Sequence, residues 1–127
     1  MSLVLVDTSV WRRYLAGSLA VRGLGDLLDE DAVLAHPFVL GELILGGLSA
    51  REEALLSHLS LAPLLAHSEV MEFVRRRRLT RRGIGWVDAH LLASGLTIPA
   101  TLWSLDRKLA TAADSLGIVF AGVDSDR

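Results

Sequence analysis

Four acidic side chains stand at positions where a carboxylate is costly or unexpected. Asp7 directly follows a short apolar run, and Asp106 comes shortly after another. Glu42 and Asp88 each lie among uncharged neighbours at helical spacing. Taken alone, Glu42 is more simply a polar helix edge, and Asp106 is more simply a residue of a first helical turn, where the helix dipole favours it. Because an unpaired buried carboxylate is so unfavourable, the four together indicate one shared acidic site.

A divalent cation would account for such a cluster, since it removes the repulsion that otherwise keeps some acids protonated. Oxygen-only ligand sets favour Mg²⁺ or Mn²⁺, whereas zinc usually takes His or Cys. The chain has no cysteine and no nucleophile-elbow or phosphate-loop motif. Its histidines show no metal-ligand spacing, and we interpret them as structural or surface residues: His36, His58, His67 and His90.

Strands that alternate with helices must position these acids. Apolar runs predict strands at 3–6, 32–35, 100–103 and 118–120, and amphipathic spacing with end signals predicts helices at 8–16, 19–29, 37–46, 50–59, 68–79, 86–94 and 104–116. Such alternation implies a three-layer α/β/α domain with a central, mostly parallel sheet. Asp7 and Asp106 then follow the carboxyl ends of strands, where open parallel sheets bind ligands.

Length and composition limit the classes of protein that remain. The 127 residues, 51% hydrophobic and 22% charged, predict one globular domain over residues 1–127 and exclude a disordered chain. The mean hydropathy is high, at +0.42, but the longest charge-free stretch is residues 89–105. It is too short and too broken by Gly and Pro to span a bilayer. With no secretory signal pattern at the start, we expect a cytoplasmic protein and no membrane partner.

The acids lie in motifs that resemble those of a known family. The segment Val6–Trp11 resembles the opening of PIN-domain nucleases, and Leu102–Asp106 resembles their last motif. Gly83–Ser94 is similar to the third-acid motif of the VapC toxins within that family, and Glu42 matches the position of the second acid. Order, spacing and total length agree, so the resemblance covers essentially the whole chain.

The resemblance implies a Mg²⁺- or Mn²⁺-dependent endoribonuclease that is the toxin of a toxin–antitoxin pair. Its catalytic and metal-binding residues would be Asp7, Glu42, Asp88 and Asp106, with Asp7 and Asp88 as direct ligands. Ser9 and Ser104 would orient a carboxylate or a water. The ion would activate a water and neutralise charge on the scissile phosphate, and a carboxylate would help to take the proton.

A run of arginines precedes the Asp88 motif. Residues 1–74 carry a net charge of −6, whereas residues 75–127 carry +4, and six of their cations fall within 75–82. Such a run is commonly a solvated helix end. Arginine also binds phosphates in a bidentate way and stacks on unpaired bases. Beside an acidic site that must attract a polyanion, the run predicts RNA contacts by Arg75, Arg76, Arg78, Arg81 and Arg82.

Two other classes of function fit parts of the sequence. A phospho-receiver module would need paired acids after the first strand, where Thr8 and Ser9 stand, and an acceptor Asp in residues 54–68, which contain no acid. The better alternative is a PIN-like domain with a complete site that acts mainly as a binding or regulatory partner. An activity assay with and without Mg²⁺ distinguishes the two.

The apolar content also predicts a protein partner. A chain of this size leaves large apolar side chains at its surface, and contiguous ones mark interfaces. The candidates are Trp11, Tyr14, Leu15, Leu43, Leu45 and Leu48. VapC-like toxins, which the chain resembles, form homodimers and are held inactive by an antitoxin. An arginine of such an antitoxin among the four carboxylates would compete with the metal.

Overall fold

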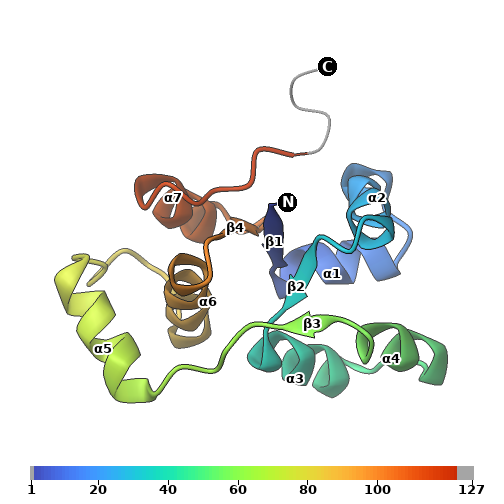
Figure 1. Ribbon diagram of the computed structural model, residues 1–127, viewed down its shortest axis with the longest axis horizontal. Coiled ribbons are helices and arrows are strands. Elements are labelled where there is room, and N and C mark those ends of the chain that lie inside the picture. The colour runs from blue at the N-terminus through green and yellow to red at the C-terminus, as the bar shows by residue number, and fades with distance from the viewer. Residues whose placement is uncertain (1, 123–127) are drawn as a thin grey trace.

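A four-stranded parallel sheet lies at the centre of the molecule. The computed structural model describes residues 2–122 (Figure 1). The strands are β1 (Leu3–Val6), β2 (Val33–Ala35), β3 (Ser60–Leu61) and β4 (Ala100–Trp103), in the order β3-β2-β1-β4. Every pairing is parallel, and helices flank the sheet, which confirms the predicted α/β/α architecture. The chain leaves β1 toward β2 on one side and returns to β4 on the other, so β1 is the topological switch point.

The helices begin and end largely where the local signals place them. Seven α-helices and one 3₁₀ turn are described: α1 (Thr8–Leu15), η1 (Leu19–Val21), α2 (Gly23–Asp29), α3 (Pro37–Gly46), α4 (Ala50–Leu56), α5 (His67–Arg76), α6 (Trp86–Thr97) and α7 (Arg107–Ser115). Pro37 is the first residue of α3, where a missing N–H costs nothing. Ser49 and Glu52 form the predicted capping box of α4, with reciprocal hydrogen bonds of 3.1 and 2.9 Å.

The hydrophobic core includes β1 and α1, the two elements that meet at the switch point. Leu5 and Val6 of β1 are completely buried, as a strand covered on both faces should be. Trp11 of α1 is also completely buried and belongs to the same apolar cluster. The prediction that Trp11 and Leu43 lie at the surface is therefore wrong, because the narrow apolar faces of α1 and α3 pack into the core. Leu45 is 90% exposed, as expected.

Two helix boundaries that concern the acids and the arginines differ from the sequence-based expectation. Helix α7 starts at Arg107 and not at Ser104, because Asp106 is its N-cap and accepts hydrogen bonds from the N–H groups of Lys108 and Leu109. Helix α5 ends at Arg76, and the chain then turns through Arg78 and Arg81, whose φ angles are 57° and 63°.

The strand content differs as well. The segment predicted as a strand at 118–120 makes only one parallel bridge, between Val119 and Leu102. The two-residue strand β3 was not expected, since both of its residues are exposed and carry no apolar pattern. Among residues 2–122, no helix has both the length and the apolar character needed to cross a bilayer.

Candidate active site

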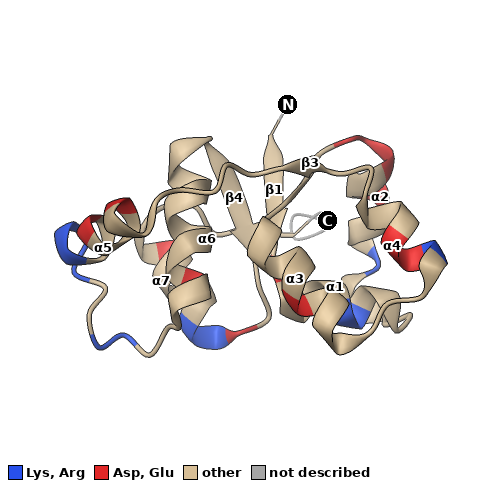
Figure 2. Cartoon of the chain, turned by 90° about the horizontal axis from the view of Figure 1, so that it is seen from below, with Lys and Arg blue, Asp and Glu red and all other residues tan. Residues whose placement is uncertain are grey.

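The fold brings the four candidate acids to the edge at the carboxyl ends of the strands. Asp7 follows β1 at the switch point, and Asp106 caps α7 just after β4. Helix α6 leads into β4, so its N-terminal turn, which holds Asp88, lies at the same edge. Glu42 lies on α3, the helix that follows β2. Figure 2 shows acidic residues on α3 and at the start of α7, with basic residues on the end of α5 and on the loop after it.

Asp7 is the most buried of the four, at 7% exposed. Two serine hydroxyls donate to the same oxygen: Ser9 Oγ lies 2.8 Å from Asp7 Oδ2, and Ser104 Oγ lies 2.8 Å from it. Each serine also accepts from the backbone after β4, Ser9 from the Leu105 N–H and Ser104 from the Asp106 N–H, both at 3.0 Å. The two hydroxyls therefore fix the Asp7 carboxylate and join the ends of β1 and β4.

The other three acids are also held by one oxygen each. Glu42 Oε1 accepts from Thr8 Oγ1 at 2.7 Å, and Asp88 Oδ2 accepts from the Gly85 N–H at 3.1 Å. Asp106 Oδ1 takes the two helix-capping bonds described above. Thr8 was not predicted as a site residue, although its position directly after Asp7, at the start of a helix, places a hydroxyl near the acids.

This arrangement leaves the second oxygen of each acid without a hydrogen bond within residues 2–122. Carboxylates that are oriented through one oxygen and open at the other fit a hard cation, for which carboxylate oxygen is the preferred ligand. As the side chains stand, however, no three His, Asp or Glu groups of the described chain are arranged so that they would hold a metal ion. The acids therefore fit Mg²⁺ or Mn²⁺ by ligand type, without a closed coordination shell.

Electrostatics link the acids to one another. Burial raises the pKa of Asp88 above its ordinary value, and the hydrogen bond from the Gly85 N–H partly offsets this effect. The negative charges of the other three acids raise the same pKa further. Asp88 thus lies close enough to the other three acids to be repelled by their charges, and a bound cation would relieve that repulsion.

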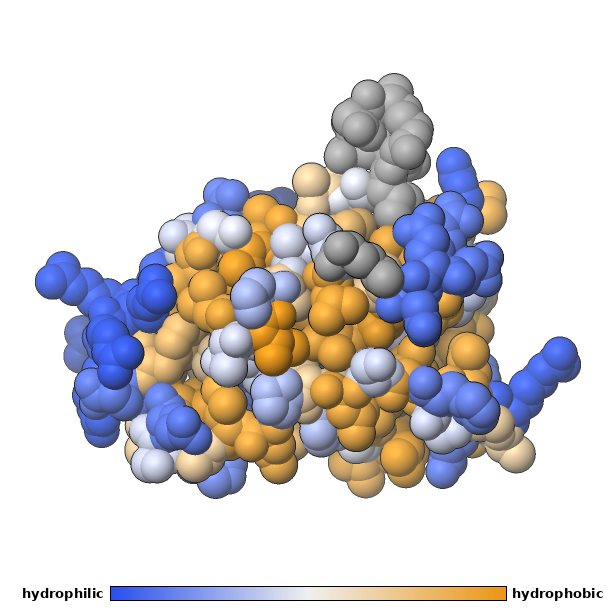
Figure 3. All heavy atoms as spheres, viewed as in Figure 1, coloured by the Kyte–Doolittle hydropathy of each residue, from blue (hydrophilic) through white to orange (hydrophobic). Residues whose placement is uncertain are grey.

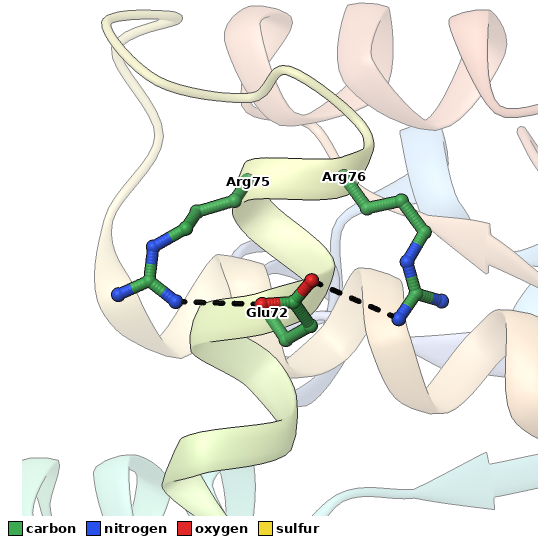
Figure 4. Close-up of polar contacts among 3 residues, drawn as sticks. All are labelled: Glu72, Arg75 and Arg76. Atoms are coloured by element: carbon green, nitrogen blue, oxygen red, sulfur yellow. Dashed lines mark ion pairs between the residues drawn. The ribbon is translucent and has the colours of Figure 1, made fainter.

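The arginine segment is exposed and partly paired. Figure 4 shows Arg75 and Arg76 on either side of Glu72, at N–O distances of 3.5 and 4.0 Å. These side chains are more than half exposed, so the pairs contribute little to stability and leave both guanidinium groups accessible. Arg82 reaches Ser115 of α7 at 3.4 Å. The loop after α5 therefore contacts α7, the helix that Asp106 caps, through the Arg82 side chain.

Histidines form a second polar cluster near the start of α6. His36 and His90 are completely buried, whereas His67 is exposed and its Nδ1 lies 3.2 Å from His90 Nε2. His36 Nδ1 accepts from the Phe38 N–H and caps α3. Burial, with a contribution from His90, lowers the pKa of His36 to about 4. Burial and His67 likewise lower the pKa of His90, so His36 and His90 are both neutral at pH 7.

Comparison with known proteins gives full-length matches. Ribonuclease VapC32 of Mycobacterium tuberculosis, in strains CDC 1551 / Oshkosh and H37Rv, is 42% identical over 122 residues, which cover 94% of this chain and 97% of the relative. No family model matches the chain.

Solved structures show the same fold. The crystal structure of PAE2754 from Pyrobaculum aerophilum matches with a TM-score of 0.60 at 16% identity, over 91% of this chain and 92% of that one. The crystal structure of FitAcB from Neisseria gonorrhoeae matches with a TM-score of 0.58 at 19% identity, over 88% and 94%. Fold and full-length similarity place the chain in the PIN-domain class. Within that class, the chain belongs to the VapC family.

Proposed function

We propose that this VapC-family protein is a Mg²⁺- or Mn²⁺-dependent endoribonuclease and the toxin of a toxin–antitoxin pair. The observation that carries this proposal is the set of four acids at the switch-point edge, each oriented through one oxygen and open at the other. By its name, the 42% identical relative is a ribonuclease. Asp7, Glu42, Asp88 and Asp106 would hold the metal, with Asp7 and Asp88 as direct ligands.

The chain's own residues have defined tasks in this proposal. When bound, the ion supplies an activated water and neutralises charge on the scissile phosphate. Ser9 and Ser104 hold Asp7, and Thr8 holds Glu42, so that their open oxygens keep one orientation. One carboxylate accepts the proton of the attacking water. No covalent enzyme intermediate is needed, which agrees with the absence of cysteine.

An RNA cleavage assay with added Mg²⁺ or Mn²⁺, and with a chelator, tests the proposal. We expect new fragment ends only when one of the ions is present. Intact RNA under all conditions, from a protein that is folded by circular dichroism, would reject the nuclease. It would favour the alternative, a PIN-like domain that acts mainly as a binding or regulatory partner.

The basic segment is proposed to bind the RNA backbone through Arg75, Arg76, Arg78, Arg81 and Arg82. We expect the double replacement Arg76→Ala and Arg78→Ala to weaken RNA binding and to flatten its salt dependence. Each lost phosphate contact lowers the slope of log K against log salt by about 0.7 for a single strand. Binding isotherms at several salt concentrations measure the slope. Arg22→Ala, an exposed arginine next to α2, is the matched control. An unchanged slope in the double variant would leave the run a solvated helix end.

A protein partner is proposed for the apolar surface between α3 and α4. Ile44 and Leu45 at the end of α3 are 53% and 90% exposed, Leu55 of α4 is 42% exposed, and a groove between the helices is lined by apolar residues such as Leu40 and Leu48. Figure 3 shows apolar side chains across the middle of one face, with hydrophilic ones over α5 at one end and over α2 and α4 at the other. We propose that a cognate antitoxin covers the α3–α4 surface and that the toxin is a homodimer.

Co-expression tests these partners. We expect the chain alone to stop growth and the product of the neighbouring gene to restore it, with a stable complex and no RNA cleavage by that complex. Leu45→Glu should weaken the complex, because it places a charge in a desolvated apolar contact. Leu19→Glu, on the separate η1 turn and 72% exposed, is the control. Light scattering gives the oligomeric state. If the chain is a monomer that does not stop growth and does not bind the product of the neighbouring gene, both the proposed antitoxin and the proposed homodimer are contradicted.

A further inference from the structure

An exposed aromatic surface lies at the start of α6 and has no part in the site described so far. Trp86 is 41% exposed, and its Nε1–H donates to His67 Nδ1 at 3.3 Å. The rings of Trp86 and His67 lie 5.7 Å apart with an interplanar angle of 30°. Phe38 stacks on His67 at 6.5 Å and 18°. We call the three side chains Phe38, His67 and Trp86 the aromatic ledge.

The buried side chain of His90 contacts all three members of the ledge. The buried His90 meets the Trp86 ring edge to face at 5.0 Å and 90°, and it meets Phe38 at 4.8 Å and 71°. Its Nε2 also faces His67 Nδ1. The orientation of the Trp86 ring is therefore determined by a hydrogen bond on one side and a ring contact on another.

Packing of the core does not explain these aromatic side chains. The half-buried Phe38 does not pack against the hydrophobic clusters of the described chain, and Trp86 is 41% exposed. A large ring that is fixed in place yet open to water contributes little burial, and such side chains are typical of recognition surfaces. Because the Trp86 N–H is already used by His67, the ring offers a ligand its flat face and no hydrogen-bond donor.

Two members of the ledge stand near two of the four acids along their helices. Trp86 lies two residues before Asp88, next to Gly85, whose N–H holds that carboxylate. Phe38 lies one turn before Glu42 on α3, about 6 Å along the helix axis. The basic loop 77–83 leads directly into the same end of α6. The ledge is therefore close to both the basic loop and the start of the helix that holds Asp88.

We propose that the aromatic ledge stacks one unpaired nucleobase of an RNA strand that reaches the acidic site. The proposal rests on the proposed ribonuclease function and adds a base-binding subsite to it. Every base has a flat π face, so stacking without hydrogen bonds selects unpaired bases and tolerates several sequences. The bases of a duplex are stacked on each other and do not reach such a surface. Other exposed apolar side chains, such as Ile44 and Leu45, are aliphatic, so they have no flat face for a base and suit a protein partner better.

Binding of a short, labelled, single-stranded oligoribonucleotide in chelator, where nothing is cleaved, tests the ledge. We expect Trp86→Ala to raise Kd about 5- to 150-fold, the range found for loss of one base–aromatic stack, and Trp86→Phe to restore most of the affinity. The control Leu19→Ala, also an exposed apolar side chain, should bind as the wild type does. A single abasic position in the RNA should weaken the wild type and leave Trp86→Ala almost unaffected.

Several results would overturn the proposal. The proposal fails if the wild type and Trp86→Ala bind the single strand with equal affinity. It also fails if Trp86→Ala loses affinity equally for the single strand and for its duplex. Loss of antitoxin binding by Trp86→Ala, with RNA affinity retained, would assign the ledge to a protein instead. Cleavage with Mg²⁺ is measured separately. If the chain binds RNA through Trp86 but does not cleave it, the proposed nuclease function is rejected and the proposed stacking site is retained.

Discussion

Replacing Asp7 or Asp88 by Asn is expected to lower metal-dependent RNA cleavage by at least about 100-fold. Each change removes the negative charge of a proposed ligand while keeping the shape of the side chain. Loss of a group that only supports a ligand already costs about 10- to 100-fold, so loss of the ligand itself should cost more. Initial rates at saturating Mg²⁺ measure the effect. Asp114→Asn, an exposed acid on α7 away from the switch point, is the control. Cleavage at the wild-type rate by both variants would contradict the site.

Stability of the same Asp88 variant shows whether the fold is intact. The pKa of Asp88 is raised in the folded chain, so the folded state holds its proton more tightly than the unfolded state does. Folding stability is therefore lost as the pH rises from the ordinary value of 3.8 through the raised value, and the penalty persists at neutral pH. In chelator at pH 7, Asp88→Asn should melt at or above the wild-type temperature. The gain should vanish below about pH 4, where both states are protonated.

The sequence predicts those elements whose stability is local or whose burial is complete. The four apolar residues of β1 predict a buried strand, and the capping box that begins with Ser49 predicts the start of α4. β3 could not be predicted, because two exposed residues become a strand only through pairing with β2. The end of α5 could not be predicted either. An arginine run contains no residue that favours a helix end, and the left-handed turn at Arg78 comes before Gly83, the first glycine after the helix.

The candidate site divides in the same way. The types of the acids and their positions after β1 and β4 follow from the sequence, since parallel strands bring their carboxyl ends to one edge. The sharing of Asp7 Oδ2 by two hydroxyls does not, because Ser9 and Ser104 are 95 residues apart and meet only when β1 pairs with β4. The aromatic ledge was missed for a similar reason: its members come from three helices and have no common spacing.

The double replacement Ser9→Ala and Ser104→Ala is expected to lower cleavage about 10- to 100-fold, although neither serine is proposed to touch the RNA. Both hydroxyls donate to Asp7 Oδ2, and without them this buried carboxylate is free to rotate and loses two hydrogen bonds. The single variants should not add up to the double, since one remaining hydroxyl still orients the group.

A merely structural role for the serines would lower stability without changing the response to metal. If the serines orient Asp7, the Mg²⁺ concentration for half-maximal cleavage should rise in the double variant, and Ser104→Thr, which keeps a hydroxyl, should retain most of the wild-type response. Ser57→Ala removes a hydroxyl that bonds only to Ala54 of α4 and to the adjacent His58, and it is the matched control. Cleavage titrated with Mg²⁺ gives the comparison. An unchanged Mg²⁺ requirement in a folded double variant would mean that the two serines only join β1 to β4 and leave the orientation of Asp7 to the backbone around it.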